Sequence, residues 1–240
     1  MNRIARLAAG TVALLGLLSA APLSTYAATP TPFLGTASQF AVLGGAGVTC
    51  TKSSVALGAV GSKLTVTQTG CSIAGVVHQR DATAYAGFAS FQTAYTALNA
   101  KTCPPANNLT GQALGGKRLA PGVYCFKTSA ALTTGILTLA GPSSGVWVFQ
   151  IGTGITTSTS QVVMASGGQA CNVYWVAGKA ATIGTDSKFK GNILAGSAVT
   201  FSGTGSSLVG RALAHTAVTM TGARLGLPSN WDTSTCHRTP

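Results

Sequence analysis

Catalytic chemistry needs side chains that can exchange protons or attack a bond, and this chain offers few of them. Its only acidic residues are Asp81, Asp186 and Asp232. Glycoside hydrolysis needs two carboxylates at a working separation, and a calcium site usually includes several carboxylates. The three scattered aspartates predict neither arrangement, and none of the three histidines lies beside a candidate nucleophile in the sequence.

One segment, Gly141-Pro142-Ser143-Ser144-Gly145, matches the GxSxG pattern of nucleophilic serine turns. In that motif the serine follows a strand and precedes a helix. Here a strand-like run over residues 146–151 follows instead, which indicates a turn between strands. The Gly-rich run over residues 44–47 likewise indicates strand turns and not a phosphate-binding loop. We therefore expect no enzymatic activity and no cofactor.

The N-terminus has the layout of a secretory signal peptide. Two arginines precede an apolar run over residues 7–23, and Thr25-Tyr26-Ala27 fits a small-x-small cleavage site. A membrane-anchor helix is the alternative, but Ser19 and Pro22 interrupt the run, which is short for a stable span. We expect residues 1–27 to be removed and residues 28–240 to form a single secreted domain with no membrane span.

The mature chain carries 13 cations and three acids, a formal charge of +10. A basic balance attracts nucleic acid, anionic lipid or acidic polysaccharide. The cations are scattered along the chain, however, which favours a role in solubility. We expect no nucleic-acid partner, and an anionic extracellular polymer stays open as an alternative partner.

Six cysteines in an exported chain predict disulfides. They are Cys50, Cys71, Cys103, Cys125, Cys171 and Cys236. No pair has CxxC spacing, which disfavours a zinc site. Six cysteines allow 15 pairings, and their spacing does not choose among them.

The C-terminal half repeats itself with a period of about 19 residues. One strand-like series begins at Asn172, Asn192 and Arg211, and a second at Ala181, Val199 and Val218. A third series pairs Phe189 with Leu208. Three short strands in each period predict a solenoid with a triangular cross-section. A β-sandwich with regular turns is the alternative.

One segment breaks this pattern. An apolar stripe at helical spacing runs from about residue 81 to 101 and comprises Ala84, Phe88, Phe91, Tyr95 and Leu98. We expect this helix to start at Asp81 and to lie along the solenoid. Cys103 ends the helix and Cys125 lies where the chain returns to the solenoid, so we expect these two to pair. Cys50 with Cys71 and Cys171 with Cys236 are then the remaining pairs.

Several segments resemble, in order, those of the ice-binding protein family of bacteria and fungi. They are LGTASQFAVL at 34–43, LAPGVY at 119–124, VWVFQIG at 146–152, CNVYW at 171–175, FKGNILA at 189–195, GRALA at 210–214 and AVT at 217–219. The similarity covers about residues 33–225. It implies a mainly β fold: a discontinuous triangular β-solenoid, or β-helix, with one long helix packed alongside. It also implies binding to an ice crystal surface.

Ice binding would need a flat, rigid array of short side chains, for which threonine suits because its χ1 angle is stiff. One candidate row is Thr157, Thr182, Thr200 and Thr219, whose bulky neighbours compete for the core. A second row past the turns is Thr159, Thr185, Ser187, Thr204, Ser206 and Thr221. The resemblance favours the second row, because the family's ice-binding side carries small residues near turns.

Two observations weaken that choice. Threonines also occur in strands through propensity alone. Charged residues lie beside the second row in sequence, and charges on the same face would hold water in arrangements unlike ice; they are Asp186, Lys188, Lys190 and Arg224. We expect a secreted monomer that adsorbs to ice and inhibits ice growth or recrystallisation. A cell-surface or matrix module that binds anionic polymers is the alternative.

Overall fold

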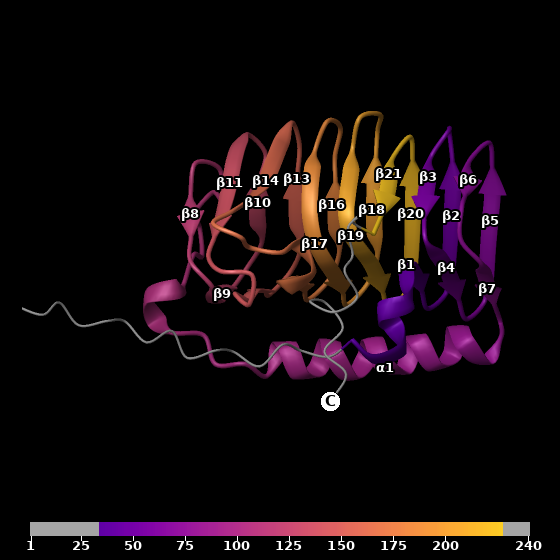
Figure 1. The fold of residues 1–240 in the computed structure, drawn as a ribbon, viewed down its shortest axis with the longest axis horizontal. Helices are drawn as coiled ribbons and strands as arrows, with labels where there is room; N and C mark the ends of the chain where they lie inside the picture. The colour runs from indigo at the N-terminus through magenta and orange to yellow at the C-terminus, as the bar shows by residue number, and fades with distance from the viewer. Residues whose placement is uncertain (1–33, 228–240) are drawn as a thin grey trace, which may run out of the picture.

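The structure is a computed structural model that describes residues 34–227. The expected signal peptide and Cys236 lie outside this range. The described chain winds into a solenoid in which short strands stack coil upon coil (Figure 1). Neighbouring strands pair in parallel throughout, as the 19-residue repeat predicts. The prediction of a solenoid is confirmed, and the β-sandwich alternative is wrong.

The solenoid has three sides, here called A, B and C. Side A contains β1 (Phe40–Gly44), β4 (Ala59–Ser62), β7 (Val77–Gln79), β9 (Gly122–Phe126), β12 (Trp147–Ile151) and β15 (Val173–Ala177). Side B contains β2 (Gly47–Thr51), β5 (Thr65–Thr69), β10 (Ala130–Leu132), β13 (Ile155–Thr157), β16 (Ala181–Ile183), β18 (Val199–Ser202) and β20 (Ala217–Thr221). Side C contains β3 (Val55–Leu57), β6 (Ser72–Ile73), β8 (Arg118–Leu119), β11 (Gly135–Ala140), β14 (Ser160–Ala165) and β21 (Arg224–Gly226).

Two long strands, β17 (Lys188–Ala195) and β19 (Ser207–Ala214), bend from side C onto side A. Sides A and C therefore belong to one 14-stranded sheet, whereas side B is a separate 7-stranded sheet. Side B is therefore a sheet of its own.

The coils do not stack in chain order. The first strand of the chain, β1, lies between β19 and β4, and β2 lies between β20 and β5. The N-terminal coils therefore continue the stack beyond the C-terminal coils. This is the discontinuous arrangement that the family resemblance implies.

The helix α1 (Ala82–Asn99) returns the chain from the end with β7 to the end with β8 and β9 (Figure 1). Its buried residues include Ala84, Phe88, Phe91 and Leu98, four of the five residues in the predicted stripe. Phe88, Phe91 and Leu98 pack against side A. The fifth, Tyr95, is only partly buried and donates a hydrogen bond to the Ala177 carbonyl at 3.2 Å. The predicted helix and its position are confirmed.

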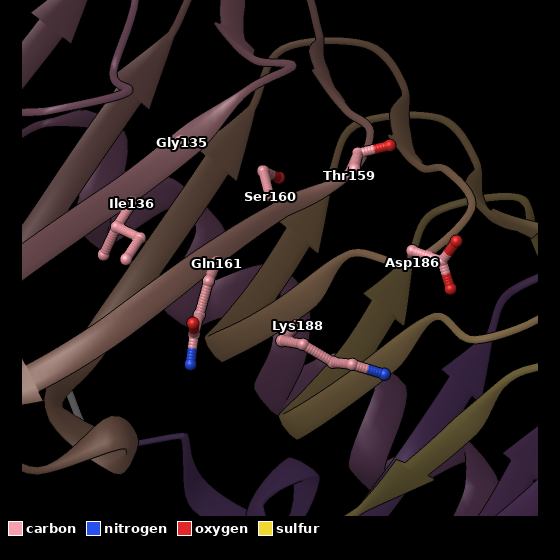
Figure 2. Close-up of a pocket in the computed structure, with 7 residues that line it drawn as sticks. All are labelled: Gly135, Ile136, Thr159, Ser160, Gln161, Asp186 and Lys188. Carbon is pink, nitrogen blue, oxygen red and sulfur yellow. The ribbon is translucent and has the colours of Figure 1, made fainter.

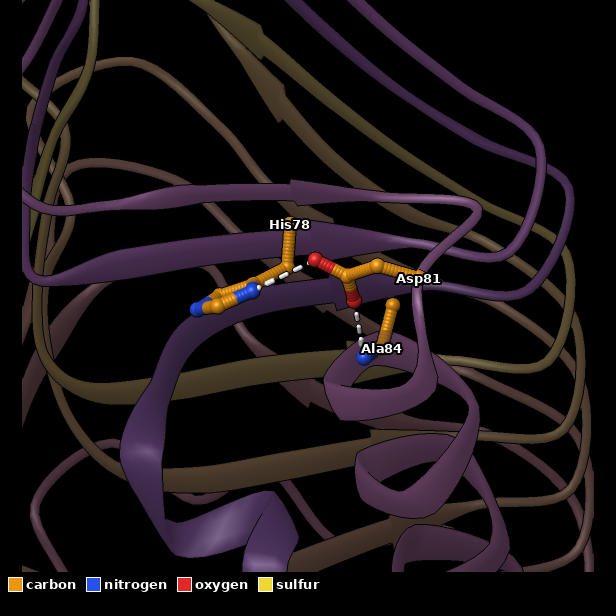
Figure 3. Close-up of polar contacts among 3 residues, drawn as sticks. All are labelled: His78, Asp81 and Ala84. Atoms are coloured by element: carbon orange, nitrogen blue, oxygen red, sulfur yellow. Dashed lines mark hydrogen bonds and ion pairs between the residues drawn. The ribbon is translucent and has the colours of Figure 1, made fainter.

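The start of α1 is capped as expected. Asp81 accepts a hydrogen bond from the Ala84 N–H at 2.7 Å, and its second oxygen lies 2.7 Å from His78 Nδ1 (Figure 3). The bond from the Ala84 backbone, more than that from His78, holds the pKa of the Asp81 carboxyl below its usual value.

A ladder of aromatic rings fills the centre of the solenoid. Tyr124, Phe149 and Trp175 lie in register on adjacent strands of side A, and Phe189 meets Trp175 from β17; successive ring centroids are 5.4, 4.0 and 4.7 Å apart. The Trp175 indole donates to the Lys190 carbonyl, so its polar atom is satisfied in the interior. This packing connects the strands of side A with the side C part of β17.

Among residues 34–227 one cation is buried, and sequence reasoning did not anticipate it. Arg211 is 2% exposed and lies between β19 and the N-terminal 3₁₀ helix η1 (Gly35–Gln39). Its guanidinium donates to the Ser38 carbonyl and to Asn192 Oδ1. These bonds join η1, near the start of the described residues, to β17 and β19, where the order of the stack is discontinuous.

Two disulfides lie within the described residues, Cys50–Cys71 and Cys103–Cys125. Both pairings agree with those expected. The first joins strand β2 to the turn before β6, and the second joins the segment after α1 to β9. Cys236, the expected partner of Cys171, lies outside the described range.

Candidate functional site

The outward residues of side B form a column of threonines. Along each strand the side chains alternate, and the bulky residues Ile183, Phe201 and Met220 point into the core and are fully buried. Their neighbours therefore point outward. In spatial order the central column is Ala131, Thr156, Thr182, Thr200, Thr219, Thr49 and Thr67, and each is in register with the next.

Small residues flank this column on both sides. The column toward side A is Ser129, Gly154, Ala180, Ala198, Ala217, Gly47 and Thr65. The column toward side C is Thr133, Ser158, Gly184, Ser202, Thr221, Thr51 and Thr69. Every position in the three columns is Thr, Ser, Ala or Gly, so the array carries no charge and no bulky side chain. We call it the threonine face.

The threonine face is regular because its strands are paired in register. Adjacent parallel strands lie about 4.8 Å apart, and alternate residues along a strand about 6.6 Å apart. Each threonine has a stiff χ1 angle, and its strand neighbours are locked in a packed core. The hydroxyls of Thr51 and Thr221, on adjacent strands, lie 3.4 Å apart. The result is a rigid two-dimensional grid of methyl and hydroxyl groups.

The four charged residues that lie beside the second predicted row in sequence are not on the threonine face. Lys188, Lys190 and Arg224 are strand residues of side C, around the corner from side B. Asp186 is exposed in the turn between β16 and β17, at the corner between sides B and C. None of them projects from the threonine face.

The structure divides the predicted site residues among three environments. Thr221 belongs to the threonine face. Thr159, Thr185 and Thr204 lie in the turns that lead from side B to side C, and they are exposed there. They border the face without forming part of its strands.

The predictions for Ser187 and Ser206 as ice-facing residues are wrong. Their exposed fractions are 0% and 2%, because both side chains turn into the interior of the corner. Ser187 Oγ accepts a hydrogen bond from the Thr157 hydroxyl at 2.9 Å, and Ser206 Oγ donates to the Gly203 carbonyl at 3.1 Å. Both serine hydroxyls therefore form hydrogen bonds inside the corner and do not face solvent.

Sequence reasoning also misplaced one threonine and missed others. Thr157 pairs with Ile183 and is 1% exposed, so Thr156 and not Thr157 continues the central column. The threonines of β2 and β5 lie outside both predicted rows, because the repeat is clear in sequence only in the C-terminal half. Their alternation with Val48 and Val66 was the available signal.

Three other kinds of feature bear on the sequence predictions: metal-binding clusters, the Gly141–Gly145 motif and membrane-spanning helices. No group of three or more His, Cys, Asp or Glu side chains among residues 34–227 could hold a metal ion. The Gly141–Gly145 segment is a turn between β11 and β12, as its sequence context indicates. Within the same range, no helix is long and apolar enough to cross a membrane.

A family model described as ice-binding-like matches residues 33–225. The chain belongs to the ice-binding-like family. It is 41% identical over 174 residues to an ice-binding protein of Nostoc sp. (strain HG1), an alignment that spans 70% of this chain and 64% of that relative. It is 36% identical over 209 residues to an ice-binding protein of Typhula ishikariensis, which spans 77% of this chain and 86% of the relative.

Solved structures of the ice-binding-like family share this fold. The crystal structure of an ice-binding protein from Antarctomyces psychrotrophicus superposes with a TM-score of 0.78 at 34% identity, and covers 83% of this chain and 100% of its own. One from an Antarctic biological consortium gives a TM-score of 0.80 at 33% identity, and covers 87% of this chain and 96% of its own.

Proposed function

We propose that this protein is exported, loses residues 1–27 and adsorbs as a monomer to ice through the threonine face, so that it inhibits ice growth or recrystallisation. The observation that carries the proposal is the central column, in which six threonines follow one another in register on a flat sheet without charge. The names of its relatives support the same activity.

Each part of the threonine face has a physical role in this proposal. The methyl groups disfavour disordered water above them, and the hydroxyls anchor the water that remains. Ordering the side chains costs little, since β-branched threonine has few rotamers to lose. A single copy carries the whole array, so adsorption needs no partner subunit.

The threonine face offers no positive charge to bind an anionic polymer, because the three columns contain no cation. Polymer binding therefore does not explain this surface. Catalysis is not proposed, since the described residues offer neither a carboxylate pair nor a nucleophile with an adjacent base.

Inhibition of ice recrystallisation tests the proposal. The wild-type mature chain should keep ice grains small, whereas Thr182→Lys should lose most of this activity, because an ammonium group at the centre of the grid retains its own hydration. Lys188→Thr is the matched control on side C and should leave the activity unchanged. Circular dichroism checks folding of each variant. Equal activity of the folded Thr182→Lys and wild-type proteins would refute the assignment of this face.

A further inference from the structure

The exposed cations of the strands are confined to one side of the solenoid. Among the described strands, the exposed or partly exposed cations are Arg118 on β8, Lys188 and Lys190 on β17, and Arg224 on β21. All four lie on side C. The described strands of side B have none, so the strand cations are distributed unevenly between the two uncovered sides.

Three of these cations form a compact group. Lys188, Ser207 and Arg224 follow one another on adjacent strands, which places the two cations about 9.6 Å apart at the backbone. Lys190 lies two residues along the strand from Lys188, at about 6.6 Å. The Debye length at physiological salt is about 8 Å. These spacings are comparable to the Debye length, so the three charges can act together on a polyanion, most strongly at low salt.

A hollow of about 270 Å³ opens beside this group, at the corner of sides B and C. Gln161 and Lys188 project from adjacent strands below it, and Thr159 and Asp186 come from the two turns above it (Figure 2). Ile136 adds an apolar side chain that is 48% exposed. The hollow thus combines an ammonium, an amide, a hydroxyl, a carboxylate and an apolar group.

This combination suits a sugar that carries an acid group. Carboxylates of the ligand would pair with Lys188, Lys190 and Arg224. Its hydroxyl groups would donate to the Asp186 carboxylate and exchange hydrogen bonds with Gln161, and its C–H face would pack on Ile136. The Asp186 carboxylate disfavours closely spaced phosphates, because like charges repel and a phosphate diester has no hydroxyl to donate. We propose that side C binds an acidic polysaccharide built from uronic acids.

This surface is independent of the proposed ice-binding face. Sides B and C meet at a corner and face different directions, so an ice crystal and a polysaccharide chain can be bound at once. The protein would then join ice to an acidic extracellular matrix. Loss of one activity does not require loss of the other.

Binding of the mature chain to sodium alginate, a polyuronate, tests the inference, with neutral dextran as the comparison polymer. The triple variant Lys188→Gln, Lys190→Gln, Arg224→Gln should weaken alginate binding about tenfold at low salt, where surface charges are least screened. A control triple variant removes the same charge away from side C: Lys101→Gln, Lys127→Gln, Lys179→Gln. It should change binding less than about twofold if the local group, and not net charge, is responsible.

Other measurements would support or overturn the inference. Ile136→Ser should weaken binding to alginate at high salt, where the apolar contact contributes most. Both triple variants should keep the wild-type inhibition of ice recrystallisation and the wild-type melting temperature. Equal weakening by the two triple variants, equal binding to dextran, tighter binding to a polyphosphate than to alginate, or no binding to alginate would each overturn the proposal.

Discussion

Replacement of Thr200 by tyrosine should separate the threonine face from ice without disturbing the fold. Thr200 lies in the middle of the central column, between Thr182 and Thr219. Its side chain points outward, while its neighbours Val199 and Phe201 fill the core. A tyrosine ring at this position would stand above the plane of the surrounding methyl groups, and the core would keep its packing.

The size of the effect follows from the dimensions of the array. Seven strands at about 4.8 Å and three columns at about 6.6 Å cover roughly 400 Å². If half of this area is apolar, its contact with ice contributes about 5 kcal/mol at 25 cal/mol per Å². A gap of about 1 Å already removes up to half of a van der Waals contact. A tyrosine ring makes a wider gap, so contact under the lifted half of the array is lost entirely, which should cost about 2.5 kcal/mol, or roughly 70-fold in adsorption.

Partitioning of fluorescently labelled protein into slowly growing ice measures this change. Thr185→Tyr is the matched variant, since Thr185 is equally outward but lies in the turn at the border of the face. It should retain most of the adsorption of the wild type. The reasoning fails if Thr200→Tyr adsorbs like the wild type while Thr185→Tyr does not, provided that both are folded by circular dichroism.

Three other substitutions test how the face is supported. Arg211→Met should lower the free energy of unfolding by about 2–4 kcal/mol in urea titration, because it leaves buried acceptors without donors; no change would contradict the structural role of Arg211. Serine at both Cys103 and Cys125 should cost about 2–4 kcal/mol by the same measurement, and an unchanged midpoint would contradict a stabilising bridge. Hydrogen bonds hold the folded pKa of Asp81 below its unfolded value, so its stabilising contribution is present above about pH 4 and is lost as the pH falls through the folded pKa. Asp81→Asn should keep the helix cap and show a shallower fall of melting temperature on acidification, and an identical acid profile would count against this role.

The fold was predictable because its repeat is local. Each period carries its own inward residues, such as Ile183, Phe201 and Met220, and the apolar stripe of α1 has helical spacing. The order of stacking has no such local signal. No residue of β1 indicates that it pairs with β19, and only the resemblance to the ice-binding family implied this arrangement.

The site was harder to predict because a shift of one residue moves a side chain from the surface to the core. Thr156 and Thr157 are both threonines on the same strand, but the side chain of Thr156 points outward and that of Thr157 points into the core. The sequence alone did not show which of the two faces solvent. The turns were also hard to predict, since Ser187 and Ser206 directly precede β17 and β19 and their side chains are buried in the corner. The burial of Arg211 could not be predicted, because its hydrogen-bond partners are the Ser38 carbonyl, far away in sequence, and the Asn192 side chain.

Thermal hysteresis of three variants, each with a tyrosine on a different surface, tests the central claim most directly. Thr219→Tyr alters the threonine face, Ser207→Tyr alters side C, and Thr93→Tyr alters the exposed surface of α1. The account predicts that only Thr219→Tyr loses the hysteresis of the wild type, with melting temperatures unchanged in all three. Full hysteresis in the folded Thr219→Tyr protein, together with its loss in either of the others, would contradict the claim that this family member meets ice through side B.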